Sequence, residues 1–431
     1  MTEPLTIEER KQIISLIQRE VVTAIGCTEP VAVALCVARA TEILGTLPEQ
    51  IDVLLSANIL KNAMGVGIPG TGMIGLPIAI ALGALIGKSE YQLEVLRDCT
   101  PEAVERGKRY IDEKRINIGL KEGIDEKLYV EVTCKSQGHQ ATAIIAGGHT
   151  CFVYQEKDGA VLQDRREACQ EEEGEAEVDL NFRKVYDFAM TAPLDEIRFI
   201  LHAAQLNKQA AEFSFKGNYG HGLGRMLQGP IEESLMGKSI FSKILAYTSG
   251  ACDARMGGAM IPVMSNSGSG NQGISCTNPV LIYAEETGKN EEELIRALML
   301  SHLAVIYIKQ SLGRLSALCG CVVASTGSSC GITYLMGGTY EQITFAVKNM
   351  IANLTGMICD GAKPSCALKV TTGVSTAVLS AVMAMENRCV TCLEGIVDDD
   401  VDTCIRNLTV IGAKGMNETD RLVLQIMTSK Q

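Results

Sequence analysis

The sequence predicts an α+β protein, in which a large, mainly helical domain carries a smaller inserted α/β domain with an antiparallel sheet. Residues 127–135, 141–146 and 150–156 alternate or run apolar with β-branched and aromatic side chains, as neighbouring strands do. From Leu180 onward, apolar stripes at helical spacing alternate with glycine-rich loops. We therefore expect the helical domain to comprise 1–45 plus 180–431 and the inserted domain to comprise 46–179.

The N-terminal region predicts two helices joined by a short motif. Thr6 is a suitable N-cap for the first helix, which we expect to end at Gly26. Thr28 can cap the second helix, and Pro30 suits its first turn. Cys27 is therefore expected just outside a helix N-terminus.

The middle of the chain predicts a strand over 51–60, then a glycine-rich loop that enters a buried helix before residue 87. Thr100 and Pro101 are expected to open an exposed helix. Further along, Pro193 predicts a helix start, and Asn290 with Glu293 forms a capping-box pattern. Helices are also expected over 341–354 and 374–386.

The composition limits the functional classes. The chain of 431 residues has a formal net charge of -12, which disfavours nucleic acid and anionic membranes as partners and favours a small-molecule ligand. Its 16 cysteines are scattered and no secretory signal precedes them, so we expect reduced thiols, some of them metal ligands, in a cytoplasmic protein.

A polytopic membrane protein is the alternative raised by three uncharged segments, 62–87, 256–284 and 315–340, each long enough to span a bilayer. The chain has no Trp and only 4% aromatic residues, so it lacks the residues that form interfacial belts. Proline, asparagine and many glycines also interrupt these segments. We therefore interpret them as the lining of a buried site.

Three cysteines are the first candidates for chemistry: Cys319, Cys359 and Cys366. Gly361 and Pro364 lie between the last two, so that stretch is not expected to be helical. Thiolates bind iron–sulfur clusters and structural zinc, and the close CGC spacing makes zinc the weaker alternative. On spacing alone, inert core thiols remain the favoured interpretation.

Cys27 is the second candidate, because a helix N-terminus lowers the pKa of a thiol. It could act as a base, a nucleophile or a ligand, and the alternative is a core cysteine. The loop SNSGSGNQG at 265–273 is the third candidate. Its backbone amides could form an anion-binding nest suited to a carboxylate, and a flexible loop is the alternative.

Other polar residues carry less information. His302 lies on an apolar helix face and is expected to be a satisfied core residue. Lys309, on the same helix, could reach a substrate carboxylate, although a surface lysine is the more common case. The sequence contains neither HExxH nor GxSxG, which disfavours zinc proteases and α/β-hydrolases.

Five motifs in order, AIGCTEPVAVAL, KNAMGVGIPGT, SGSGNQG, GRLSALCGC and GMICDGAKPSCALK, resemble the L-cysteine desulfidase family. That family is related to the alpha part of iron–sulfur L-serine dehydratases. The resemblance spans essentially the whole chain. It implies a 4Fe–4S cluster with one open iron, held by Cys319, Cys359 and Cys366, and no pyridoxal phosphate. Cys321 is a neighbouring alternative to Cys319 as ligand.

The resemblance also implies a reaction, the α,β-elimination of L-cysteine to hydrogen sulfide, pyruvate and ammonia. Cys27 matches the family's proposed proton acceptor, so we expect its pKa to lie near neutral. The nest is expected to bind the substrate carboxylate through the residues Ser267, Gly268, Ser269 and Asn271. The alternatives are dehydration of L-serine or a similar amino acid and, less favoured, a non-catalytic binding protein or a transporter. A homodimer is plausible.

Overall fold

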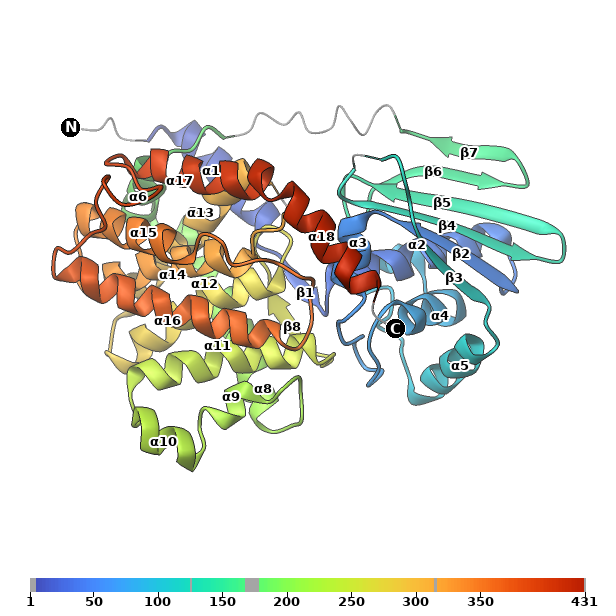
Figure 1. Cartoon of the computed structure of the whole chain (residues 1–431), viewed down its shortest axis with the longest axis horizontal. Helices are drawn as coiled ribbons and strands as arrows, with labels where there is room; N and C mark the ends of the chain where they lie inside the picture. The colour runs from blue at the N-terminus through green and yellow to red at the C-terminus, as the bar shows by residue number, and fades with distance from the viewer. Residues whose placement is uncertain (1–4, 125, 167–177, 314–315, 430–431) are drawn as a thin grey trace.

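The chain folds into a body of helices that lies beside a smaller unit built on one large sheet, and this arrangement confirms the predicted α+β class (Figure 1). The computed structural model describes residues 5–124, 126–166, 178–313 and 316–429. Arg314 and Leu315, within the GRLSALCGC motif, lie outside the described residues.

The large sheet has six strands in the order β3-β2-β4-β5-β6-β7. The predicted antiparallel strands are present and pair as neighbours. The sheet is nevertheless mixed, because β2 and β3 are parallel, and the long crossover between them contains three α-helices and a short 3-10 helix. The strands are β2 (Gln50–Leu55), β3 (Ile116–Leu120), β4 (Tyr129–Ser136), β5 (His139–Ala146), β6 (Phe152–Lys157) and β7 (Ala160–Asp164).

Helices cover one face of this sheet. Helix α2 (Thr28–Leu44) packs on β4 and β5, α4 (Leu76–Ile86) packs on α2, and α5 (Pro101–Asp112) packs on α4. The strand predicted over 51–60 was too long, because α3 (Ala57–Ala63) begins directly after Ser56. Its residues are buried on several sides, so the apolar run that predicted a strand also suits a short buried helix.

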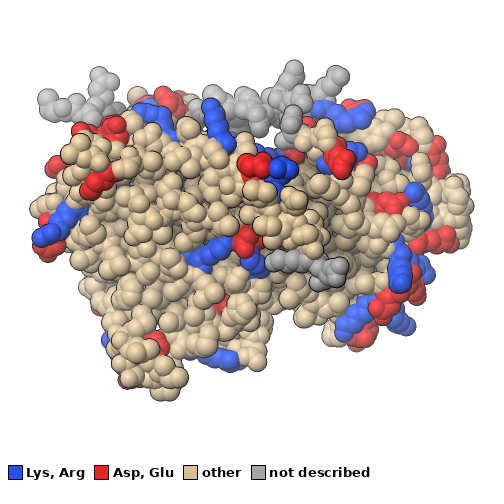
Figure 2. Space-filling model, viewed as in Figure 1, with Lys and Arg blue, Asp and Glu red and all other residues tan. Residues whose placement is uncertain are grey.

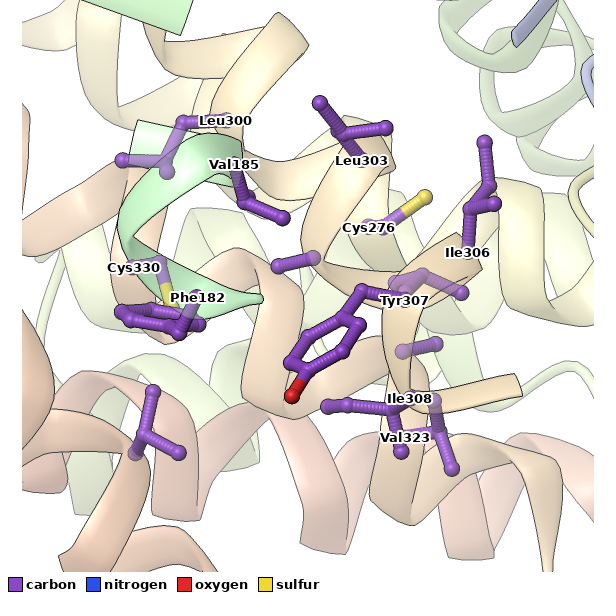
Figure 3. Packing of buried hydrophobic residues seen from close by; sticks show 14 of the residues in the cluster. Phe182, Val185, Cys276, Leu300, Leu303, Ile306, Tyr307, Ile308, Val323 and Cys330 are labelled. Atoms are coloured by element: carbon purple, nitrogen blue, oxygen red, sulfur yellow. The ribbon is translucent and has the colours of Figure 1, made fainter. Parts of the chain in front are cut away.

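The helical body is organised around α14 (Gly320–Leu335), which contacts four other helices. Gly327 illustrates why α14 needs small residues, since a Cβ there would lie 2.4 Å from the carbonyl oxygen of Ser301. Figure 3 shows part of the core beside it, where Phe182 and Val185 lie near α13. The four helices are α12 (Gly270–Glu286), α13 (Glu291–Leu312), α15 (Tyr340–Leu354) and α16 (Cys366–Met385).

The first helix, α1 (Ile7–Glu20), has the predicted N-cap at Thr6, which forms a capping box with Glu9, but it ends earlier than expected. Strand β1 (Thr23–Ile25) follows it and pairs with β8 (Pro262–Met264), because the β-branched residues after α1 favour an extended chain. In this antiparallel register Ser265, which opens the loop at 265–273, lies beside Val22, and Thr28 contacts the same loop with its Oγ1 3.5 Å from the carbonyl oxygen of Gly268. The capping box of Asn290 is confirmed, and α16 begins at Cys366, earlier than the predicted 374.

The remaining elements complete the body and the connection between its parts. They are η1 (Ser89–Glu94), α6 (Phe182–Thr191), α7 (Leu194–Ile197), η3 (Arg198–Ile200), α8 (Leu201–Phe215), α9 (Leu223–Met226), α10 (Pro230–Met236), α11 (Ile240–Met256), α17 (Val401–Val410), η4 (Ile411–Gly415) and α18 (Asn417–Thr428).

Among the described residues, one helix, Cys366–Met385, is long and apolar enough to cross a membrane. Its most apolar window is 44% buried, and a core helix passes the same test. Its exposed side includes Leu379 and Val382, and Figure 2 shows few charged residues over α16 compared with the sheet unit. Within the uncharged segment 315–340, residues 320–335 form α14, which is buried inside the helical body.

The close approach of α14 and α13 generates a stability prediction. Gly327→Ala should lower the free energy of unfolding by about 1–3 kcal/mol, because the added methyl group overpacks against a backbone carbonyl. Gly415→Ala is the matched control, since its Cβ would approach nothing nearer than 3.9 Å. Denaturant unfolding measures both, and equal stability of the two variants would contradict this account of α14.

Candidate active site

A cavity of about 120 Å³ lies between the helical body and the smaller unit. Its lining comes from the start of α2, from α3, from the end of α11, from the loop before α12, and from the two cysteine segments. Every site residue that the sequence singled out lines it: Cys27, Ser267, Gly268, Ser269, Asn271, Cys319, Cys359 and Cys366.

A larger hollow of about 510 Å³ lies on the sheet unit, lined in part by Arg39, Gln155 and Arg165. None of the predicted site residues lines it. The smaller cavity has the stronger chemical character, because it gathers thiols, a carboxylate and cationic side chains in a buried setting.

Backbone pairing brings two of the three predicted ligands together, although forty residues separate them in sequence. The amide of Cys319 donates to the carbonyl oxygen of Met357 at 2.9 Å, and the amide of Cys359 donates to that of Ala317 at 2.6 Å. The two segments therefore run antiparallel and side by side. Both thiols face the same cavity.

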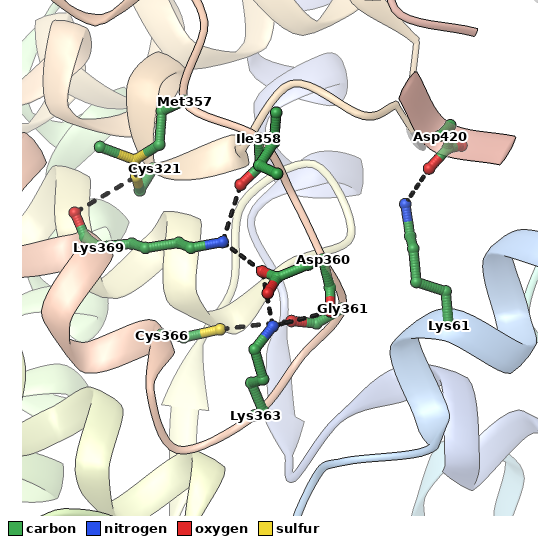
Figure 4. A network of polar contacts seen from close by, with 10 residues as sticks. All are labelled: Lys61, Cys321, Met357, Ile358, Asp360, Gly361, Lys363, Cys366, Lys369 and Asp420. Atoms are coloured by element: carbon green, nitrogen blue, oxygen red, sulfur yellow. Dashed lines mark hydrogen bonds and ion pairs between the residues drawn. The ribbon is translucent and has the colours of Figure 1, made fainter. Parts of the chain in front are cut away.

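The third cysteine, Cys366, opens α16 and is positioned by the loop before it (Figure 4). Asp360 accepts from Lys363 at 2.6 Å and also pairs with Lys369, so two lysines hold this turn. The Cys366 thiol donates to the carbonyl oxygen of Gly361 at 3.6 Å. The ion pairs of the Asp360 carboxylate thus fix the turn that separates Cys359 from Cys366.

The same loop contacts the smaller unit. Gly361 has a positive φ of 92°, and a Cβ there would lie 2.2 Å from the carbonyl oxygen of Lys61 in α3. Lys61 is buried and forms an ion pair with Asp420 of α18 (Figure 4). The C-terminal helix is thereby attached to α3 next to the cavity.

Cys321 also lines the cavity, and its thiol makes contacts of its own. It donates to the sulfur of Met357 at 3.2 Å and to the carbonyl oxygen of Lys369 at 3.5 Å. Hydrogen bonding from Cys321 lowers the pKa of Cys319, whereas the same contact and burial raise the pKa of Cys321. Cys319 is therefore the more readily ionised thiol of the pair, and its role as ligand stays a prediction.

Cys27 is itself the N-cap residue of α2, a position predicted for Thr28, and its thiol donates to Oε2 of Glu29 at 2.8 Å. Burial and the nearby Glu29 carboxylate raise the pKa of Cys27 well above its usual value. The expectation of a near-neutral pKa was therefore wrong. The helix terminus favours the thiolate, but desolvation and a neighbouring negative charge outweigh that effect.

Glu29 is the main functional residue that the sequence reasoning missed. Burial alone would raise its pKa, but the positive charge of His149 and the hydrogen bond from Cys27 produce a net lowering. Its Oε2 also accepts from Thr28 at 3.1 Å, and its Oε1 accepts from Asn62 at 3.2 Å. The sequence feature that could have identified Glu29 is the presence of an acidic residue at the start of an otherwise apolar helix.

The loop at 265–273 is fixed in place by His302, which is buried and hydrogen-bonded as predicted. Asn266 donates to the carbonyl oxygen of His302 at 3.1 Å, and Thr277 Oγ1 lies 2.9 Å from its ring. Burial lowers the pKa of His302 to about 3, so the ring is neutral. The amide of Ser267 donates to the carbonyl of Glu20, which limits the predicted nest.

Lys309 and Arg255 line the cavity together with Lys369; the sequence suggested that Lys309 could reach a substrate carboxylate but made no such suggestion for Arg255. Lys309 is only 7% exposed, so its interpretation as a surface residue was wrong. Arg255, at the end of α11, is 3% exposed and donates from Nη1 to Oδ1 of Asn271 at 3.1 Å. Arg255 had no sequence signal, because nothing in the local pattern distinguishes it from an exposed helix terminus.

Within the described ranges, no group of three or more His, Cys, Asp or Glu side chains could hold a single metal ion. A cluster of several irons separates its thiolates more widely than one ion does, and its ligands are cysteines. Cysteines from three segments line the cavity without a competing His or Asp in its lining. This all-sulfur set fits an iron–sulfur cluster.

Comparison with known proteins gives a consistent result. The sequence matches the family described as serine dehydratase alpha chain over residues 90–425. A UPF0597 protein of Bacteroides fragilis is 76% identical over 426 residues, covering 99% of this chain and 100% of that protein. A UPF0597 protein of Porphyromonas gingivalis is 58% identical over 428 residues, covering 98% and 99%. The chain therefore belongs to the serine dehydratase alpha chain family.

Proposed function

We propose that this protein is a cytoplasmic iron–sulfur lyase that removes the β-substituent of a small α-amino acid, with L-cysteine as its substrate. The products would be hydrogen sulfide, pyruvate and ammonia. The observation that carries the proposal is the single cavity that combines three cysteines with the Cys27–Glu29 pair. Membership of a family described as a serine dehydratase chain supports the lyase class.

Cys319, Cys359 and Cys366 would hold the cluster, because they line the cavity from three neighbouring segments. When bound, the cluster supplies a Lewis-acidic iron, which stabilises negative charge on a leaving sulfur or oxygen. Lys369 lies beside these thiols and adds positive charge near them.

The Cys27–Glu29 pair would handle the proton on the substrate α-carbon. The raised pKa of Cys27 keeps Sγ protonated in the resting protein, and the lowered pKa of Glu29 keeps its carboxylate ionised. Transfer of the Sγ proton to Oε2, across their 2.8 Å contact, leaves a thiolate that takes the α-proton. The two pKa shifts disfavour this transfer in the resting protein, so the thiolate is a minor species, but its raised pKa makes it a strong base once it forms.

Removal of the α-proton determines how the bonding electrons of the substrate move. The pair from the broken Cα–H bond forms the Cα=Cβ bond, and the β-substituent leaves with the electrons of its own bond to Cβ. The released aminoacrylate tautomerises to an imine, which water hydrolyses to pyruvate and ammonia. That last step needs no group of the protein.

Dehydration of L-serine is the second candidate, favoured by the description of the matched family. The two reactions share the α-proton transfer and differ only in the leaving group. Incubation of the anaerobically purified protein with each amino acid separates them. Release of sulfide, with a higher kcat/KM for L-cysteine than for L-serine, supports the desulfidase. A higher kcat/KM for L-serine would instead show that the protein is a dehydratase.

The ligand assignment is tested by removing one thiol. Cys359→Ser should lose the visible absorption band and most of the iron of the anaerobically prepared protein, together with its activity. Cys330→Ser is the control, because Cys330 is buried in α14 and does not line the cavity. Full iron content in Cys359→Ser, or equal losses in both variants, would contradict the assignment.

The proton-transfer pair predicts a different pattern. Cys27→Ser and Glu29→Gln should keep the iron and the absorption spectrum but lower kcat by about 100- to 10,000-fold, as expected when a catalytic base is removed. Glu131→Gln is a control carboxylate variant, since Glu131 pairs with Lys121 on the sheet, away from the cavity. Loss of iron in Cys27→Ser would show that Cys27 is a ligand.

A further inference from the structure

Arg255 is a buried cation that has no carboxylate partner among the described residues. Arg255 lines the cavity, and the residue is only 3% exposed. Nη1 donates to the neutral amide oxygen of Asn271, whereas Nε is buried without a hydrogen-bond partner. A buried guanidinium in this state is costly unless an anion completes its surroundings.

The protein's own carboxylate in the cavity does not supply that anion. Glu29 forms no hydrogen bond or ion pair with Arg255, since its Oε2 accepts from Cys27 and Thr28 and its Oε1 accepts from Asn62. Glu29 is also the only acidic residue among the described residues that line the cavity, and it faces three basic ones. The three are Arg255, Lys309 and Lys369. The cavity is therefore electrostatically suited to an anionic ligand.

The loop beside Arg255 is less able to bind an anion by itself than its sequence indicates. The amide of Ser267 donates to the carbonyl of Glu20, and the amide of Ser269 donates to the carbonyl of Asn266. Both donors are thus engaged within the backbone. The hydrogen-bond donors that an anion needs, and that these two amides do not offer, must therefore come from a charged side chain.

Gly270 allows the guanidinium to lie directly against the start of α12. A Cβ at this position would lie 2.3 Å from Nε and 2.9 Å from Cζ of Arg255. The absence of a side chain at Gly270 is therefore a packing requirement of the Arg255 position. The glycine and the arginine form one structural unit at the wall of the cavity.

We propose that Arg255 binds the α-carboxylate of the substrate through its Nη groups, because Nε is packed against Gly270 and a guanidinium offers parallel N–H donors to a carboxylate. This identifies the substrate class as α-amino acids with a free carboxylate and excludes their amides and esters. The identity of the amino acid comes from the proposed function, and the inference rests on the proposed function in that respect only. It leaves Cys27 and Glu29 to act at the adjacent α-carbon.

The test uses L-alanine, which has the carboxylate and the amino group but no β-leaving group, and L-alaninamide, which lacks the carboxylate. Calorimetric titration of the anaerobically prepared wild type should show L-alanine binding on the order of 10- to 100-fold more tightly than the amide. Arg255→Met should abolish this preference while the iron content stays unchanged. Gly270→Ala should weaken it, because the methyl group displaces the guanidinium.

Arg296→Met is the matched control, since the Arg296 side chain is only 15% exposed and pairs with Glu292 outside the cavity. It should keep the wild-type preference. An unchanged preference in Arg255→Met, its loss in Lys309→Met alone, or no L-alanine binding by the wild type would each overturn the inference.

The same titrations separate this inference from the proposed lyase activity. Loss of the carboxylate preference in Arg255→Met, in a protein that converts neither L-cysteine nor L-serine, supports the carboxylate site and contradicts the lyase. Turnover by the wild type with an unchanged KM in Arg255→Met supports the lyase and contradicts the role of Arg255.

Discussion

The antiparallel contact between the backbone around Cys319 and the backbone around Cys359 is the constraint on which the cavity depends. Two hydrogen bonds between these segments fix the start of α14 against the loop that leads into α16. Asp360 then forms ion pairs with Lys363 and Lys369, which hold the turn of that loop and thereby set the position of Cys366. Three thiols from two segments that are forty residues apart in sequence therefore face one cavity because of a short piece of backbone pairing.

A second short pairing, between β1 and β8, supplies the other half of the cavity. It fixes the start of the loop before α12 beside the end of α1, where the amide of Ser265 donates to the carbonyl of Val22. Thr28 joins the Cys27 motif to the same loop by donating to the carbonyl of Gly268 at 3.5 Å. The smaller unit closes the cavity through α3, whose Asn62 holds Glu29. The buried carboxylate is tolerated because each of its oxygens accepts a hydrogen bond, as buried polar groups require.

The sequence predicted the fold class, several helix caps and the strands β4 to β6, because these depend on local patterns. It placed the end of α1 too late and extended β2 into α3, since apolar β-branched residues fit a strand or a buried helix equally well. The Cys27, loop and three-cysteine motifs all line the cavity, and their roles there stay predictions. Glu29, Arg255 and the burial of Lys309 depend on contacts between distant segments, which no local pattern encodes.

The central claim is that three cysteines hold a four-iron cluster in which one iron stays open to the substrate. Mössbauer spectroscopy of the anaerobic protein, enriched in the Mössbauer-active iron isotope, tests it most directly. The account predicts that adding L-serine or L-cysteine changes the signal of one iron site and leaves the others unaltered. Absence of a cluster after reconstitution, or a cluster whose sites all ignore the substrate, would contradict it.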